Sequence, residues 1–351
     1  MERNLLMMII VFGVLAVVGL VLGLVLGLKD FDDEVLNSYS NTDELIQKFP
    51  VKHPTEVKDG IEKYIQNRLL TGFENWNRGF ETWKAWGNIL YTKDSIYNVH
   101  GARLTLEHYQ EDMYETLGKM SIQMGQFNNM LIVGDFCAIY YDIIIGKNKG
   151  TTMEFVKFKN YGTGDNPDLR VVEGWGGVKD ATYYDSIARQ GSAEKQVQEE
   201  QNNFLLRYEL SGSTSAEKYF IKYETDNEDD GTILNCILDG FEAWNKGIAS
   251  FNDTDGYKEW VKAKFDESAK SLYGRNNRNK DQYIDAIFTL FNEKTITKLY
   301  FDNFLIRDNW AAIHYRYRSV DKANTKVEIG DRMEFFQFND DKTKIVNNWV
   351  K

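Results

Sequence analysis

The sequence contains one short segment twice. Residues 72–79 read GFENWNRG and residues 240–247 read GFEAWNKG. The apolar residues around each segment follow one another at steps of three and four, which is the spacing of one stripe on an amphipathic helix. They are Ile65, Leu69, Phe73, Trp76, Phe80 and Trp83 in the first copy, and Ile233, Ile237, Phe241, Trp244, Ile248 and Phe251 in the second. Each copy is therefore predicted to form a helix.

The similarity continues far beyond this helix. Further aligned segments are 136–141 with 310–315, 153–155 with 333–335, and 170–175 with 344–349. Solenoid repeats have periods of only ~20 to 50 residues, so a repeat this long indicates a duplicated domain. In both copies helices precede a run of strands, which favours an α+β fold with an antiparallel sheet. In the first copy we expect helices at 60–83 and 106–119, and strands at 121–131, 136–145, 152–158 and 169–175.

The first residues predict a membrane anchor. Residues 5–28 carry no charge, and a helix that crosses a bilayer needs ~20 apolar residues. A cleaved signal peptide has a shorter apolar core and a small-residue cleavage site, so we expect an uncleaved anchor. Arg3 precedes the segment and acidic residues follow it, which places the rest of the chain outside the cytoplasm. The expected location is thus a membrane, with a single pass.

The expected organisation follows in chain order. It comprises a cytoplasmic tip (1–4), the transmembrane anchor (5–28), a stalk (29–56), the first domain (57–178), a linker that could contain a hairpin (179–225) and the second domain (226–351). The net charge of −11 repels phosphate backbones, so nucleic acid is not an expected partner. The four histidines have no metal-ligand spacing, and no phosphate-binding loop occurs. We therefore predict no metal and no cofactor.

A family resemblance rests on residues 88–101 (NILYTKDSIYNVHG), which precede a helix and strands containing residues 153–155 and 171–173. This pattern resembles a SnoaL-like domain of the nuclear transport factor 2-like superfamily, over residues 57–178 and more faintly over 226–351. The resemblance implies a cone, in which a curved antiparallel sheet wraps around helices and leaves a mostly apolar pocket in its mouth. The predicted fold class is therefore α+β, with two tandem cone-shaped barrels behind one transmembrane helix. Members of the superfamily often dimerise through their sheets, so the two copies could form a pseudo-dimer within one chain.

The family's chemistry is general acid/base catalysis. Its isomerases place an aspartate base just before the glycine of the connecting segment, where this chain has Asn98, Val99 and His100. Asparagine cannot accept a proton at neutral pH, whereas a histidine with a pKa of ~6.5 can. His100 is therefore a candidate catalytic residue. The alternative is an ordinary loop histidine near solvent.

Two glutamates form a second candidate site, independent of the resemblance. If the last two strands pair so that Val156 lies opposite Val171, then Glu154 lies opposite Glu173. Two carboxylates on an apolar face raise one another's pKa and can hold a proton for catalysis. The alternative is that both lie at the rim of the sheet and pair with neighbouring basic residues.

Three functions remain open. The first is binding of a small apolar molecule or a peptide in a cone pocket, which the duplicated scaffold and the poorly duplicated polar residues favour. The second is SnoaL-like acid/base catalysis in the first domain, of the isomerase, cyclase, dehydratase or hydrolase type. The third is a structural or assembly role without a ligand. The candidate pocket residues are Trp76, Phe80, Trp175, Trp244 and Trp349.

Overall fold

The structure is a computed structural model. It describes residues 42–58, 60–99, 102–119, 121–163, 167–176, 221–223, 231–249, 255–273, 276–325 and 327–351. The predicted membrane anchor, His100 and most of the predicted linker lie outside these residues. Within them, no helix is both long enough and apolar enough to span a bilayer.

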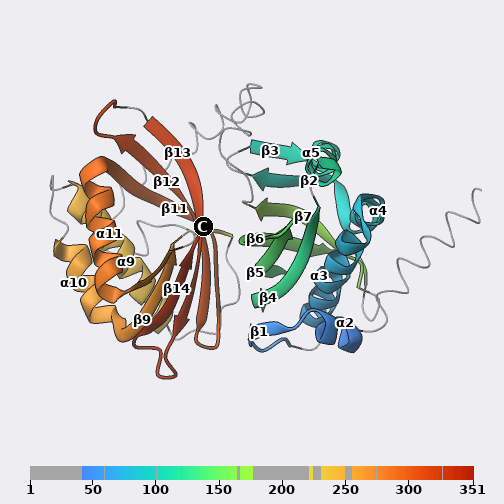
Figure 1. The fold of residues 1–351 in the computed structure, drawn as a ribbon. Helices are drawn as coiled ribbons and strands as arrows, with labels where there is room; N and C mark the ends of the chain where they lie inside the picture. The colour runs from blue at the N-terminus through green and yellow to red at the C-terminus, as the bar shows by residue number, and fades with distance from the viewer. Residues whose placement is uncertain are drawn as a thin grey trace, which may run out of the picture.

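The described chain forms two halves, each a curved sheet with helices on one face (Figure 1). The first half contains α2 (Thr42–Lys48), β1 (Val51–Pro54), α3 (Ile61–Arg78), α4 (Phe80–Leu90), β2 (Tyr91–Val99), β3 (Ala102–Thr105), α5 (Leu106–Lys119), β4 (Ile122–Val133), β5 (Phe136–Ile145), β6 (Asn148–Asn160) and β7 (Leu169–Gly176). The second contains β8 (Ile221–Tyr223), α9 (Thr232–Ala249), α10 (Asp255–Lys264), β9 (Phe265–Tyr273), β10 (Asn276–Asn279), α11 (Lys280–Glu293), β11 (Lys294–Arg307), β12 (Trp310–Asp321), β13 (Val327–Phe338) and β14 (Ile345–Val350).

The two sheets have the same topology. The first has the strand order β1-β4-β5-β6-β7-β2-β3, and the second, read in the same direction, has β8-β11-β12-β13-β14-β9-β10. In each, four consecutive strands form an antiparallel meander, and the strand after α4 or α10 joins its far edge in parallel. The α+β fold and its duplication are therefore confirmed for the described residues.

The glycine that opens the repeated segment allows a close approach between two helices. A Cβ atom on Gly72 would lie 2.5 Å from the ring of Trp86, and one on Gly240 would lie 2.4 Å from the ring of Trp260. Real Cβ contacts are not this short, so a larger residue would displace either indole. The repeat thus preserves the packing of the first helix against the next one.

The repeated Trp and Asn fix the first helix to the sheet. Trp76 Nε1 donates to the carbonyl of Ile122 at 3.2 Å, and Asn77 bonds both the N–H and the carbonyl of Met124, at 2.7 and 3.0 Å. The register of β4 against β5 shifts just after Met124, and the side chain of Asn77 satisfies the backbone at that irregularity.

The second half repeats these bonds. Trp244 Nε1 donates to the carbonyl of Ile296 at 2.7 Å, and Asn245 bonds the carbonyl and the N–H of Lys298 at 2.7 and 3.0 Å. The segment that occurs twice in the sequence is therefore the joint between helix and sheet. Its residues fix the first helix of this joint to the sheet in both halves.

Two features of the first half differ from expectation. The helix predicted over residues 60–83 is two helices, because Gly79 adopts a φ of 128° between α3 and α4. The connecting segment forms strands β2 and β3, which periodicity did not indicate. In the second half, α9 continues past the equivalent glycine to Ala249.

The sheets of the two halves pack face to face, with the helices outside (Figure 1). A buried apolar cluster joins them, made of Leu131, Val133, Phe136, Ala138, Tyr140, Met153, Phe155 and Trp175 from the first half, and of Leu305, Trp310, Ala312, Met333 and Phe335, with Trp349 beside them, from the second. Each half thus has a core between its helices and sheet, and both share a third core.

A buried ion pair also crosses between the halves. Arg307 donates from both terminal nitrogens to the carboxylate of Glu62, at 2.8 and 3.1 Å. Glu62 also accepts the backbone N–H groups of Gly134 and Lys58. Burial raises the pKa of Glu62, but the bonds from Arg307 and the two N–H groups outweigh it, so the pKa lies below its usual value.

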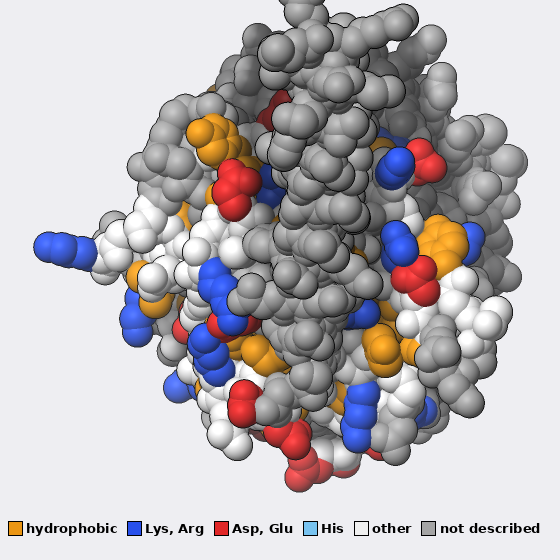
Figure 2. All heavy atoms as spheres, turned by 90° about the vertical axis from the view of Figure 1, so that its right-hand side faces the viewer, with side chains coloured by type: hydrophobic (Ala, Val, Ile, Leu, Met, Phe, Trp, Pro, Cys, Tyr) orange, Lys and Arg blue, Asp and Glu red, His pale blue; other side chains and the backbone are white. Residues whose placement is uncertain are grey.

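The described surface on the helix side of the first half carries charges of both signs. Figure 2 shows acidic and basic side chains interspersed with apolar ones on the face at the right of Figure 1. On α3, the largely buried Glu74 pairs with Lys48 and with Arg78.

Candidate functional site

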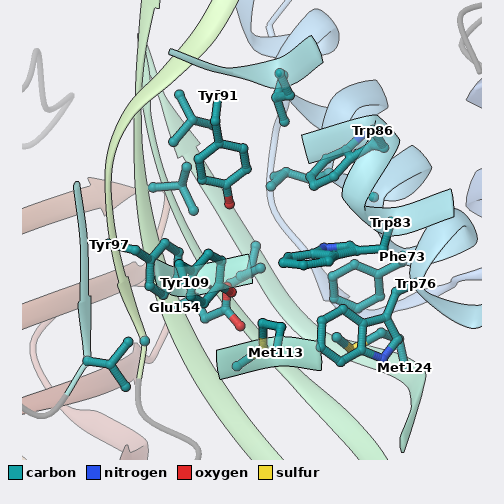
Figure 3. A pocket seen from close by; sticks show the side chains of 18 of the residues that line it. Phe73, Trp76, Trp83, Trp86, Tyr91, Tyr97, Tyr109, Met113, Met124 and Glu154 are labelled. Atoms are coloured by element: carbon teal, nitrogen blue, oxygen red, sulfur yellow. Dashed lines mark hydrogen bonds between the residues drawn. The ribbon is translucent and has the colours of Figure 1, made fainter. Parts of the chain in front are cut away.

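A cavity of about 100 Å³ lies in the first half, between the helices and the inner face of the sheet (Figure 3). Its wall is almost entirely aromatic and aliphatic. The labelled residues of Figure 3 that line it are Phe73, Trp76, Trp83, Trp86, Tyr91, Tyr97, Tyr109, Met113, Met124 and Glu154. Such concave, apolar sites with few polar groups are typical of small-molecule binding.

Glu154 on β6 is the one acidic residue among the described residues that line the cavity. Two tyrosines hold its carboxyl group: Tyr97 OH donates to Oε2 at 2.6 Å, and Tyr141 OH donates to Oε1. Tyr141 comes from β5, the direct neighbour of β6, and Tyr97 comes from β2, which β7 separates from β6. The carboxyl group is therefore fixed in orientation at the cavity wall.

Two glycines on β7 make room for one of these tyrosines. A Cβ atom on Gly174 would lie 2.5 Å from the ring of Tyr97, and one on Gly176 would lie 2.9 Å from its hydroxyl oxygen. On its other side, Tyr97 stacks on Tyr109 with ring centroids 4.0 Å apart. The Tyr97 ring thus lies between the glycines of β7 and Tyr109 of α5, and its hydroxyl group contacts Glu154.

The site favours a protonated acid. Burial raises the pKa of Glu154, and the hydrogen bonds from Tyr141 and Tyr97 only partly counter this effect. Burial also raises the pKa of both Tyr97 and Tyr141, so their hydroxyl groups stay protonated and remain donors. A buried carboxyl group with neutral hydrogen-bond donors can act as a proton donor, or its ionised form can bind a cation.

The predicted pairing of Glu154 with Glu173 is wrong. Glu154 lies opposite Gly176, and Glu173 lies opposite Lys157. The next pair is Phe158 with Val171, so Val172 is an extra residue in β7. Such a bulge reverses the side-chain parity of the strand, and the prediction assumed an unbroken alternation.

Glu173 therefore lies away from the cavity. Its carboxylate accepts a hydrogen bond from Asn98 Nδ2 at 3.1 Å, and it is not among the lining residues. Asn98 is buried and also donates to the carbonyl of Gly174, so its side chain joins β2 to β7. His100 follows in the sequence but lies outside the described residues.

The predicted pocket residues separate into three places. Trp76 lines the cavity of the first half, and Trp244 lines a much smaller one in the second half. Trp175 and Trp349 lie in the apolar cluster between the halves, where Trp175 contacts Phe136. The bulge explains this placement, because it turns Trp175 to the face opposite Val171.

Phe80 lies beside the cavity and does not line it. Its ring contacts Trp83 with centroids 5.9 Å apart and Tyr114 with centroids 5.1 Å apart, along a depression on the outer side of the helices.

The second half keeps the carboxyl group but supplies different donors. Tyr315 OH donates to Glu334 at 2.6 Å, as Tyr141 does to Glu154. The other donor is Asn348 Nδ2 at 3.2 Å, and Asn348 also accepts from Ser271 Oγ. The strand registers place Ser271 and Asn348 where the first half has Tyr97 and Gly174.

The equivalent cavity of the second half, beside Glu334, measures only about 20 Å³. A separate pocket of about 240 Å³ lies between α10 and α11. Phe336 occupies the position of Val156, and Lys298 occupies the position of Met124. Sequence reasoning missed these exchanges, although the alignment of the two copies contained them. Among the described residues of both halves, no group of three His, Cys, Asp or Glu could hold a metal ion.

Solved structures of SnoaL-like and nuclear transport factor 2-like proteins match one part of the chain at a time. A nuclear transport factor 2-like protein from Anabaena variabilis is 13% identical with a TM-score of 0.30, covering 36% of this chain and 92% of its own. A SnoaL-like polyketide cyclase from Agrobacterium tumefaciens is 12% identical with a TM-score of 0.28, covering 34% and 89%. A nuclear transport factor 2-like protein of unknown function from an Exiguobacterium species is 14% identical with a TM-score of 0.27, covering 33% and 95%.

Because these identities and TM-scores are low, the matches are similarities alone, and the resemblance to the superfamily stays a prediction. No protein-family model matches the sequence. No curated protein matches it either.

Proposed function

We propose that the first half binds a small, largely apolar molecule in the cavity beside Glu154. One observation carries this proposal: the same scaffold occurs twice, and one copy keeps an aromatic cavity of about 100 Å³ where the other is filled. The side chains around an empty cavity lack van der Waals contacts, which lowers stability. The second half avoids this cost because larger residues fill the equivalent space. The volume suits a small molecule better than a peptide.

The full chain in maltoside micelles provides the test. Native mass spectrometry should release a discrete small molecule from the wild-type protein, and Val156→Phe should lose it, because the ring that fills the second half then fills the first. Phe336→Leu serves as the control, since it changes the equivalent position without touching the cavity. An empty wild-type cavity that also takes up no apolar probe would exclude this function and leave an assembly role.

A second candidate function is acid/base catalysis through Glu154. The raised pKa of this carboxyl group and its two tyrosine donors favour a proton donor in an apolar site. Neither Glu173 nor any described histidine is among the lining residues to assist it. In this case Glu154→Gln should accumulate a molecule that differs chemically from the one bound by the wild-type protein. Identical molecules from both proteins would argue for binding without turnover.

We further propose that residues 5–28 anchor the protein in a membrane, with the two halves outside the cytoplasm. The uncharged length of this segment and the acidic residues after it support the proposal. The wild-type protein should stay with membranes after alkaline extraction, and a variant without residues 1–28 should not. Release of both proteins to the same extent would contradict an anchor.

A further inference from the structure

The second half holds an ammonium group among aromatic rings. The Nζ atom of Lys298 lies 4.1 Å from the ring centroid of Phe241, 4.5 Å from that of Trp244, 5.0 Å from that of Tyr315 and 6.0 Å from that of Tyr257. Contacts within about 6 Å of a ring face attract a cation, and more strongly where water is excluded. Lys298 is buried, so these rings replace much of its hydration.

Lys298 and Met124 occupy the same position in their halves. The backbone of each forms two hydrogen bonds with the Asn of the repeated segment, Asn245 and Asn77. Each also precedes the register shift of its strand. The first half therefore lacks the ammonium group at this place, and a neutral thioether side chain stands there instead.

The first half nevertheless keeps one pair of the surrounding rings in the same arrangement. Phe73 and Tyr141 have centroids 4.7 Å apart at 70°, and Phe241 and Tyr315 have centroids 4.8 Å apart at 77°. The two pairs thus provide nearly the same ring geometry, one with a lysine and one without.

The second pair is retained as well. Trp76 and Trp83 have centroids 5.2 Å apart at 79°, and Trp244 and Tyr257 have centroids 4.9 Å apart at 84°. In the first half Trp83 takes the place of Tyr257. Trp is the ring that binds cations best, so the exchange strengthens the set of rings.

A carboxyl group completes both sites. Glu334 acts on Lys298, since its charge raises the pKa of the ammonium group against the lowering effect of burial. Glu154 has the equivalent position in the first half. Among the described residues that line the cavity there, none is Lys, Arg or His. The first half thus has the rings and the acid of a cation site, with no cation of its own among those lining residues.

We propose that the ligand of this cavity is a small organic ammonium ion, whose charged group lies among Phe73, Trp76 and Trp83 and faces Glu154. This inference rests on the proposed binding function and specifies the class of ligand. Alkyl substituents on the nitrogen fill the apolar wall, and the carboxylate neutralises the charge. In the second half, the ammonium group of Lys298 occupies the place that we assign to the charged group of the ligand.

Choline and its neutral carbon isostere, 3,3-dimethylbutan-1-ol, test the proposal by calorimetry on the full chain in maltoside micelles, with empty micelles as the blank. Choline should bind at least about tenfold more tightly, because desolvated cation–ring contacts and the carboxylate discriminate the charge. Glu154→Gln should weaken choline by about tenfold and leave the alcohol nearly unchanged.

Two substitutions at one position sharpen the test. Met124→Lys should abolish choline binding, because it supplies an internal ammonium group as the second half does. Met124→Leu has similar volume without charge, and it should bind choline within about threefold of the wild-type protein. Thermal unfolding of each variant confirms that it is folded, and Glu154→Gln tests the charge independently if Met124→Lys does not fold.

The pH dependence gives a separate readout, since choline keeps its charge at every pH. The groups that face Glu154 stay protonated between pH 5 and 8, because burial raises the pKa of each of them: Tyr91, Tyr97, Tyr141 and Cys137. Choline binding needs the ionised form of Glu154, whose pKa is raised, so affinity should increase with pH over this range. Glu154→Gln should remove the increase.

The outcomes separate the two proposals. Equal affinity for choline and the alcohol, or a neutral molecule released from the wild-type protein, would overturn the ammonium ligand and leave the binding function intact. An empty cavity that takes up neither probe would overturn both.

Discussion

The two halves share a scaffold and differ in what fills it. Strand order, the bonds from Trp and Asn of the repeated segment, and the close approach of Gly72 or Gly240 to an indole are the same in both. The space between helices and sheet is open in one half and closed in the other. The joint between helix and sheet thus maintains the fold, and the residues around the cavity have been free to diverge.

The closure results from a few exchanges at equivalent strand positions. From the first half to the second they are Val156 to Phe336, Ile143 to Tyr317, Gly176 to Val350 and Met124 to Lys298. Each adds volume or charge inside the same scaffold. This comparison supports the proposal that the first half holds a ligand and the second half supports it, and four experiments test that division.

The largest effect should come from the ion pair that joins the halves. Arg307→Ala leaves Glu62 buried with its backbone donors alone, and breaking such a pair costs about 3 to 5 kcal/mol of unfolding free energy. Chemical denaturation measures the loss. Arg170→Ala removes an exposed partner of Asp168 and should cost less than about 1 kcal/mol. Similar losses in both variants would contradict a structural joint at Arg307.

Exchanging the residues that fill or empty each half should lower the unfolding free energy by unequal amounts. Phe336→Val opens a void in a packed core and should cost about 2 to 3 kcal/mol. Val156→Phe enters an existing cavity and should cost less than about 1 kcal/mol while abolishing ligand binding. Thermal and chemical unfolding of both variants checks the asymmetry. Equal losses would mean that the first cavity is not available to a ring.

Lys298 should make the second half pH-sensitive. Burial lowers its pKa from 10.5 to about 8. Between these values the unfolded chain binds more protons, so wild-type stability gains from this residue as pH rises. The difference corresponds to at most about 3 kcal/mol, and ring contacts reduce it. Lys298→Met should therefore be more stable by about 1 to 2 kcal/mol at pH 7.

Denaturation of wild-type protein and Lys298→Met at pH 7, 8, 9 and 10 provides the measurement. Other groups titrate in both proteins, so the difference between them isolates Lys298. The advantage of the variant should shrink steadily from pH 8 upward. A constant difference across the series would show that Lys298 keeps its usual pKa.

The smallest effect should come from the donor that differs between the halves. Tyr97→Phe removes one of the two hydroxyl donors to Glu154 and should cost about 1 kcal/mol in chemical denaturation. It should also weaken choline binding at pH 7, because the ionised form of Glu154 loses a donor. Tyr91→Phe is the control, since Tyr91 lines the same cavity and the bonds that hold Glu154 come from Tyr97 and Tyr141. Equal effects of the two substitutions would remove Tyr97 from the site.

Much of the architecture was predictable because the sequence repeats. The collinear matches indicated two copies, and the helix over 106–119 and the strand over 136–145 have the predicted bounds. Glu154 was identified as a candidate because it shares one face of its strand with Val156 and Phe158 and was expected to lie opposite Glu173. Strands β2 and β3 escaped prediction, since polar and apolar residues do not alternate regularly along them.

The positions of the other candidate site residues could not be predicted, because they depend on a backbone irregularity that has no sequence pattern. The extra residue Val172 reversed the parity of β7, which moved Glu173 and Trp175 away from the cavity. The buried charge of Lys298, in contrast, was predictable from the sequence. A lysine aligned with Met124 inside an otherwise apolar stripe marks a buried charge, and such a charge requires compensation.

The contact between Tyr97 and Gly174 has a consequence for the history of the duplication. Asparagine at position 174 is blocked while the Tyr97 ring is present, because even a Cβ atom would lie 2.5 Å from it. Serine at position 97 removes this obstacle, and the second half has that combination in Ser271 and Asn348. The order of the two substitutions is therefore constrained. From Tyr and Gly to Ser and Asn, the tyrosine must be replaced first; in the reverse direction, the asparagine must be replaced first.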